Sequence, residues 1–184
     1  VDVKAATQKG VLVVNSPGGN TIAAAEHTIA MMLALSRNIP IANSSMFKGK
    51  WERKKFVGNE LFKKKLGVVG LGKIGTHVAK VANAMGMEVL GYDPFVSNER
   101  AQQLQVKLSE LDILFQDSDY VTLHLPRTVE TENLVDINVL KSMKNTSKLI
   151  NCARGGIIDE EALAEALNNS LIGGAAIDVY SEEP

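Results

Sequence analysis

The segment from Leu66 to Asp93 constrains the fold more than any other part of the chain. Four parts follow one another in it: a short apolar strand, a glycine-rich turn, a helix and a second strand, at residues 66–69, 70–75, 76–85 and 89–92. Two parallel strands need such a crossover, which usually carries a helix and packs it on one face of the sheet. We therefore predict a parallel α/β unit here.

The turn has the spacing G-x-G-x-x-G, with its glycines at Gly70, Gly72 and Gly75. The first allows a tight turn, the second lets a pyrophosphate approach the backbone, and the third lets helix and strand pack closely. The pyrophosphate then meets N–H groups at the positive end of the helix. Asp93, at the end of the second strand, can accept hydrogen bonds from ribose hydroxyls and repels a 2′-phosphate. Glycine pairs also mark ordinary turns, but strand, helix and acid are in register here, so the pattern predicts NAD(H) rather than NADP(H).

The composition limits the class of protein. The chain has 184 residues, enough for one good core, and a net charge of −1, without the basic excess of a nucleic-acid-binding protein. No apolar run reaches the length of a membrane span. Cys152 is the single cysteine, which excludes an internal disulfide and suits a reducing compartment. We expect a cytoplasmic protein without nucleic-acid or membrane partners.

The residues before the glycine turn form several expected elements. A short helix ending at Gly10 precedes a buried strand at 11–14, a long apolar helix spans 21–37, and a further helix follows Pro40 at 41–47. The long helix has little polar surface, so we expect it to pack on its own domain and on a second chain or domain. The basic connector 48–65 is either a solvated loop or an anion-binding arm.

Strands and helices continue to alternate after Asp93, which predicts a doubly wound parallel sheet. We expect strands at 120–124, 148–151 and 174–177, and helices at 136–143 and 159–167. Ligands of such sheets bind beyond the carboxyl ends of the strands. Arg154 stands there before two glycines that we expect to open space, so it either grips a carboxylate and its neighbouring carbonyl or forms a structural salt bridge.

Together these motifs resemble the D-isomer-specific 2-hydroxyacid dehydrogenases along the whole chain. The resemblance rests on five segments: 70–75, 92–94, 124–126, 151–156 and 178–184. It implies a Rossmann-type NAD-binding domain over 17–184, preceded at 1–16 by a remnant of the substrate domain. The implied reaction is hydride transfer between NAD and C2 of a 2-hydroxy acid, with no metal.

The resemblance also implies roles for single residues. Arg154 binds the substrate carboxylate and carbonyl, and Glu183 orients a catalytic histidine that is expected beyond Pro184, so we expect this chain alone to be inactive. The three histidines of the chain, His27, His77 and His124, do not match that residue. The other implied cofactor contacts, which include a backbone contact from Cys152 in preference to a redox role, are Lys73, Ile74, Pro94, Leu125, Pro126, Thr131, Cys152, Ala153 and Asp178.

Within the family, segments 25–28 and 49–56 are most similar to members that act on a phosphorylated 2-hydroxy acid. Arg53 then resembles a residue that reaches the substrate phosphate, across the interface of a homodimer or homotetramer. Two alternatives stay open: a reductase of glyoxylate or hydroxypyruvate, and a non-enzymatic NAD-sensing corepressor.

Overall fold

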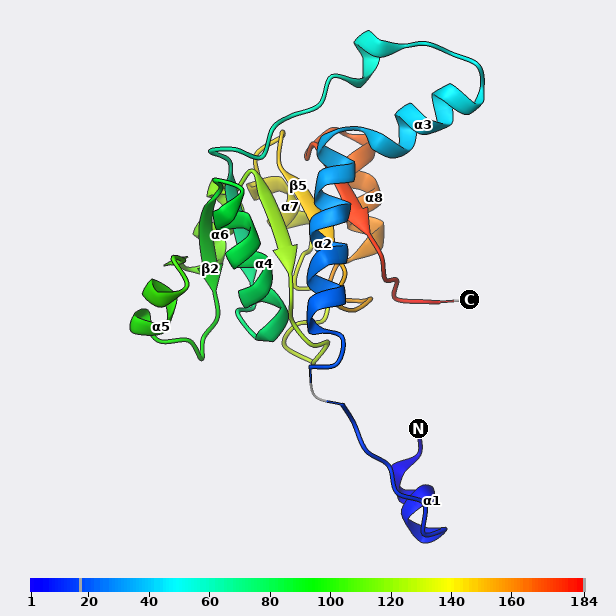
Figure 1. The fold of residues 1–184 in the computed structure, drawn as a ribbon, viewed down its shortest axis with the longest axis vertical. Helices are drawn as coiled ribbons and strands as arrows, with labels where there is room; N and C mark the ends of the chain where they lie inside the picture. Colours follow the sequence, from blue (N-terminus) through cyan, green and yellow to red (C-terminus); the bar gives the residue numbers. More distant parts are fainter. Residues whose placement is uncertain (17, 184) are drawn as a thin grey trace.

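A computed structural model describes residues 1–16 and 18–183. Six parallel strands form one sheet in the order β3-β2-β1-β4-β5-β6 (Figure 1). The strands are β1 Lys65–Val69, β2 Glu88–Tyr92, β3 Lys107–Leu108, β4 Tyr120–Leu123, β5 Lys148–Asn151 and β6 Gly174–Ile177. The order reverses between β1 and β4, so the crevice of a doubly wound sheet opens there. This confirms the predicted fold class.

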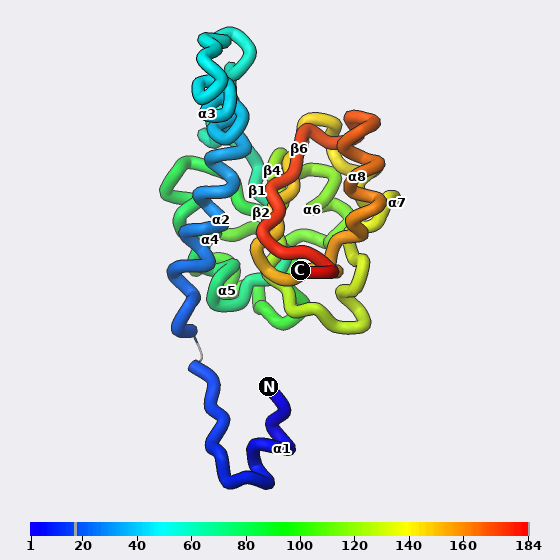
Figure 2. The backbone as a smooth tube through the Cα atoms, turned by 90° about the vertical axis from the view of Figure 1, so that its right-hand side faces the viewer, coloured from blue at the N-terminus to red at the C-terminus, as the bar shows by residue number. Residues whose placement is uncertain are grey.

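Helices cover both faces of the sheet (Figure 2). They are α1 Val3–Gln8, α2 Thr21–Ser36, α3 Ile39–Phe47, α4 Lys73–Ala84, α5 Asn98–Gln103, α6 Leu111–Asp117, α7 Ile137–Ser142 and α8 Glu160–Asn168, with a 3-10 helix, η1, at Arg53–Phe56. Met32 of α2 and Val78 of α4 are fully buried in one apolar core, and Phe115 of α6 and Leu140 of α7 are buried in a second. Because both faces are covered, β4 and β5 are buried along their whole length, as parallel strands require.

Helix α2 runs from the carboxyl edge of the sheet to its amino edge. Ser36, its last residue, places its hydroxyl 3.0 Å from the hydroxyl of Tyr120, where β4 begins, and Leu35 offers its carbonyl to Lys148, where β5 begins. The helix therefore begins near the strand ends that carry the predicted site. Helix α3 and η1 follow at the opposite edge, where they project from the body (Figure 1).

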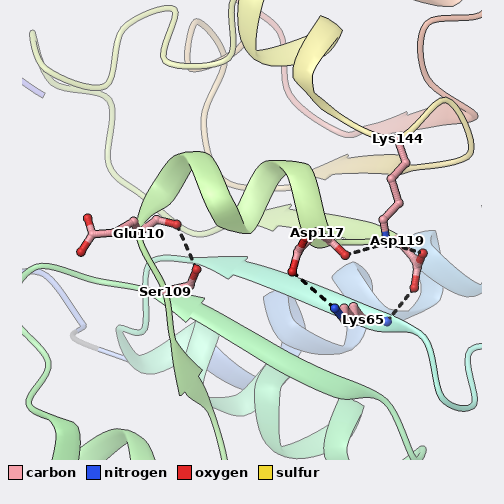
Figure 3. Close-up of polar contacts among 6 residues, drawn as sticks. All are labelled: Lys65, Ser109, Glu110, Asp117, Asp119 and Lys144. Carbon is pink, nitrogen blue, oxygen red and sulfur yellow. Dashed lines mark hydrogen bonds and ion pairs between the residues drawn. The ribbon is translucent and has the colours of Figure 1, made fainter.

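A polar cluster fixes the amino ends of β1 and β4 (Figure 3). Asp119 accepts the N–H of Lys65 at 2.9 Å and the ammonium of Lys144 at 3.0 Å. Burial raises the pKa of Asp119, but these two donors outweigh it and hold that pKa below its ordinary value. The Lys65 ammonium also pairs with Asp117 at 3.4 Å. With their starting points anchored, β1 and β4 end level with each other at Val69 and Leu123.

Several expected elements differ from the structure. Residues 11–14 are not a strand: Leu12 is 85% exposed, and the segment lies with α1 apart from the sheet, where no strand is available to pair with it (Figure 1). Helix α4 begins at Lys73 rather than at residue 76, because Gly72 is its N-cap. Pro40 stands in the first turn of α3, where proline is tolerated, so that helix starts earlier than expected.

The sequence pattern did not locate β3, α5 and α6, which lie between Asp93 and Tyr120. In the described residues, no helix is long and apolar enough to cross a membrane. Two positions of the sequence analysis lie outside the described residues: Pro17, where the predicted cofactor domain begins, and Pro184, the last residue of the C-terminal motif.

Candidate functional site

The three glycines of the turn meet three different surroundings. A Cβ at Gly75 would stand 1.9 Å from the Gly70 carbonyl oxygen, and one at Gly70, whose φ is +96°, would stand 2.5 Å from the His124 carbonyl oxygen. A Cβ at Gly72 would meet nothing within 4 Å. Gly72 also caps α4 without a side-chain hydrogen bond, so the N–H groups of the first helical turn face open space. This geometry fits the pyrophosphate of a dinucleotide.

Asp93 connects the turn to the end of β2. One carboxylate oxygen accepts the N–H of Leu71 at 2.8 Å and the other accepts the N–H of Phe95 at 2.9 Å. A carboxylate offers about four acceptor positions, so about half of them stay available for ribose hydroxyls. Beside it lies a cavity of about 610 Å³, lined by Tyr92, Asp93, Pro94, Asn98, Leu108, Ser109 and Glu110. The last four of these were not expected from the sequence, because α5 and β3 were not located.

A second cavity, of about 270 Å³, lies at the carboxyl ends of β1, β4 and β5. It brings together six of the predicted residues and three others, and its lining is Asn20, Ala24, Ile74, His124, Leu125, Pro126, Cys152, Ala153 and Arg154. Ala24 belongs to α2. The prediction considered only residues at the ends of strands, so it did not include this part of the cavity wall. The parallel sheet thus gathers segments that are far apart in the sequence.

Lys73 and Thr131 lie at the margins of this site. The side chain of Lys73 extends toward Gly18, where its Nζ is 3.5 Å from the position of a Cβ. The hydroxyl of Thr131 donates to the carbonyl of Pro126 at 2.7 Å and accepts the N–H of Thr128 at 2.8 Å. Thr131 therefore shapes the loop that carries Pro126.

The buried side chain of Asn151 shapes the turn that presents Arg154. Its amide donates to the carbonyl of Arg154 at 3.0 Å, and its oxygen accepts the N–H of Ala153 at 3.0 Å. Asn151 lies in the segment 151–156 that carries the family resemblance, but no role was predicted for its side chain. A buried amide at a strand end is the signal that would have found it. Arg154 itself is exposed and donates to the Ala153 carbonyl at 2.6 Å. Among the described residues it forms no salt bridge, the structural alternative considered for it.

The glycines after Arg154 do not open space, so that expectation is wrong. A Cβ at Gly155 would stand 1.7 Å from the Tyr180 carbonyl oxygen, and one at Gly156 would stand 2.7 Å from the guanidinium carbon of Arg127. The missing side chain of Gly155 instead lets the C-terminal segment pass directly over the turn, and that of Gly156 leaves room for the Arg127 guanidinium. That segment carries Glu183, whose carboxylate accepts the N–H of Tyr180 at 3.3 Å.

The histidines differ in surroundings. His124 is partly buried, its ring lies 3.1 Å from the Thr122 hydroxyl, and desolvation lowers its pKa to about 4. It is therefore neutral at pH 7, although it lines the cavity with Arg154. His27, on α2, lies 3.1 Å from the carboxylate of Asp178, which follows β6. His77 lies on α4, outside the residues that line the two site cavities.

Arg53 is not near the strand ends of its own chain. It belongs to η1, on the projecting arm at the amino edge (Figure 1). A cavity of about 430 Å³ there is lined by arm residues alone: Ala42, Met46, Lys50, Trp51, Glu52, Arg53 and Phe56. Within one chain, Arg53 and Arg154 stand at opposite edges of the sheet.

Known proteins resemble this chain in both sequence and structure. The chain is 61% identical to D-3-phosphoglycerate dehydrogenase of Synechocystis sp. and 46% identical to that of Homo sapiens, in both cases over 100% of this chain. It covers 33% and 34% of those relatives, so it spans about a third of their length. Among solved structures, the pyruvate reductase of Chlamydomonas reinhardtii matches 100% of this chain and 54% of its own, with a TM-score of 0.92 and 36% identity.

D-lactate dehydrogenase with NAD+ from Lactobacillus jensenii gives a TM-score of 0.85 and 32% identity, over 99% of this chain and 55% of its own. Residues 29–184 match the model of the D-isomer specific 2-hydroxyacid dehydrogenase NAD binding domain. With its glycine turn, Asp93 and sheet order, the chain therefore belongs to the D-isomer specific 2-hydroxyacid dehydrogenases, of which it forms the NAD-binding domain.

Proposed function

We propose that the protein to which this domain belongs transfers a hydride between NAD and C2 of D-3-phosphoglycerate, yielding 3-phosphohydroxypyruvate as the first step of phosphorylated serine biosynthesis. The observation that carries the proposal is the cavity of about 270 Å³ in which Arg154 joins Ile74 from the glycine turn. An exposed guanidinium beside a dinucleotide site suits a 2-oxo acid, because it can bind the carboxylate and the carbonyl together. The curated relatives named D-3-phosphoglycerate dehydrogenase support the choice of substrate.

Different residues of the chain have different roles in this reaction. The fixed positive charge of Arg154 stabilises negative charge on the C2 oxygen in the transition state. Glu183 lies on the segment that crosses Gly155 and orients a histidine, which exchanges a proton with the C2 oxygen. The carboxylate of Glu183 also raises the pKa of that histidine toward neutrality. Bound NAD supplies the hydride acceptor. Leu125, Pro126 and Ala153 form an apolar part of the cavity wall.

A calorimetric titration of the chain with NADH, and separately with NADPH, tests the cofactor assignment. We expect NADH to bind and NADPH to bind at least tenfold more weakly, because Asp93 repels the 2′-phosphate. In Asp93→Asn the difference should shrink, since the charge is lost while one acceptor oxygen is kept. Equal affinities of the unaltered chain for the two cofactors would contradict the role of Asp93.

Substitution of Arg53 tests whether the substrate is phosphorylated. Because it lies far from Arg154 of its own chain, we propose that it reaches the substrate phosphate of a partner subunit in a homodimer or homotetramer. In the full-length enzyme, Arg53→Ala should raise KM for 3-phosphohydroxypyruvate about tenfold or more and leave KM for hydroxypyruvate nearly unchanged, with Lys54→Ala as the matched control. Equal losses on both substrates would favour a reductase of unphosphorylated acids, such as the glyoxylate reductase among the structural neighbours.

We place the protein in the cytoplasm without nucleic-acid or membrane partners. A net charge of −1 and a single cysteine support this location. A non-enzymatic NAD-sensing relative would bind NADH without turnover, so the activity of the full-length protein on the phosphorylated substrate separates that alternative.

A further inference from the structure

Three side chains of different elements converge beside the cavity that holds Arg154. His27 comes from the second turn of α2, Cys152 directly follows β5, and Asp178 directly follows β6. Strands β5 and β6 are neighbours that end level at Asn151 and Ile177, so Cys152 and Asp178 emerge side by side. Their ligand atoms and that of His27 all lie within 4.8 Å of one another.

We propose that His27, Cys152 and Asp178 form a binding site for a divalent cation of the zinc type. Imidazole, thiolate and carboxylate are the three donor types that zinc takes in proteins. The His27 Nε2 and Asp178 Oδ1 atoms are 3.1 Å apart, close to the roughly 3.3 Å between two tetrahedral ligands that each lie about 2.0–2.1 Å from the ion.

The charges of the three side chains suit a divalent ion. A thiolate and a carboxylate together balance the two positive charges of the metal, and neutral imidazole completes the set. The side chains of His27 and Asp178 are 48% and 45% exposed, which leaves an entry path from solvent, while Cys152 is half-buried. Three protein ligands leave a fourth position for water. We expect a dissociation constant on the order of micromolar, weaker than four-ligand structural sites.

The site overlaps the cofactor cavity, since Cys152 also lines it. A bound ion would draw Cys152 and Asp178 toward His27 and away from the positions in which they are expected to contact the cofactor. The metal therefore acts as an inhibitor that competes with NADH. This regulatory part rests on the proposed cofactor placement, whereas the metal site itself does not.

Titration of the chain with Zn²⁺ or Co²⁺ alone tests the site. We expect one ion per chain, and a thiolate-to-cobalt charge-transfer band in the near ultraviolet. Cys152→Ser should abolish that band, and His27→Gln and Asp178→Asn should each weaken zinc binding at least tenfold. His77→Gln, the same substitution on α4 outside the cluster, should bind zinc like the unaltered chain. Because His27 is exposed, its substitution should not disturb folding.

Unaltered zinc affinity in the three cluster variants, or a cobalt band that survives Cys152→Ser, would overturn the site. The competition is tested by titrating NADH without Zn²⁺ and with Zn²⁺ at about ten times its dissociation constant for the unaltered chain. The NADH affinity should fall about tenfold in the unaltered chain and about twofold or less in His27→Gln. An NADH affinity that zinc does not change would overturn the overlap. Failure of NADH to bind without zinc would instead count against the cofactor assignment and leave the direct metal titration standing.

Discussion

At the scale of single residues, His124 shows how the site controls a charge. Its ring is desolvated at the end of β4, which lowers its pKa from 6.5 to about 4. Between these values the unfolded chain binds a proton that the folded chain does not. The free energy of unfolding therefore decreases as the pH falls from about 6.5 to about 4, by at most roughly 3.5 kcal/mol, because one pKa unit corresponds to about 1.4 kcal/mol.

We expect His124→Gln to flatten this part of the curve of unfolding free energy against pH, measured by urea denaturation at several pH values. The matched variant His77→Gln should keep the slope of the unaltered chain. If His124→Gln and the unaltered chain lose stability in parallel below pH 6.5, the desolvation of His124 is not the cause.

At the scale of elements, two glycines at the junction between β1 and α4 have different roles: Gly75 is needed for packing, and Gly72 for the proposed cofactor contact. Gly75→Ala forces a methyl group against the Gly70 carbonyl, so it should lower the unfolding free energy by about 1–3 kcal/mol. Gly72→Ala has free space and a φ of −64°, so stability should change by less than about 0.5 kcal/mol. The added methyl group nevertheless occupies the proposed pyrophosphate position, and NADH affinity should fall at least tenfold.

Chemical denaturation and NADH titration of both variants check this pair. Full NADH affinity in Gly72→Ala would show that the open space beside that glycine is not where the cofactor binds.

At the scale of the whole molecule, the arm formed by α3, η1 and the residues between them exposes large apolar side chains. Phe47 is 85% exposed and Trp51 is 80% exposed, and such groups mark a contact surface. We propose that they lie in the interface of the homo-oligomer. The double variant Phe47→Ser, Trp51→Ser should shift the sedimenting species toward the monomer. Phe95, which is 94% exposed beyond β2, supplies the control Phe95→Ser, which should leave the assembly unchanged. An arm variant that sediments like the unaltered chain would exclude this surface from the interface.

The sequence by itself determined the parts that depend on local chemistry. The glycine spacing, the apolar strands and the acid after β2 act within a few residues, through steric limits and hydrogen bonds, so the strand–turn–helix–strand unit at 66–93 was predicted from the sequence. The same holds for the alternation that predicts a doubly wound sheet.

Only the tertiary structure decided the features that depend on partners distant in sequence. Residues 11–14 have the composition of a strand, but a strand needs a neighbour to pair with. The backbone of Tyr180 packs directly against Gly155. Arg53 lies at the opposite edge of the sheet from Arg154, because α2 crosses the whole sheet. The convergence of His27, Cys152 and Asp178 likewise follows from the packing of α2 over β5 and β6. Such contacts join residues that lie from 25 to 151 positions apart along the chain, so no local pattern in the sequence encodes them.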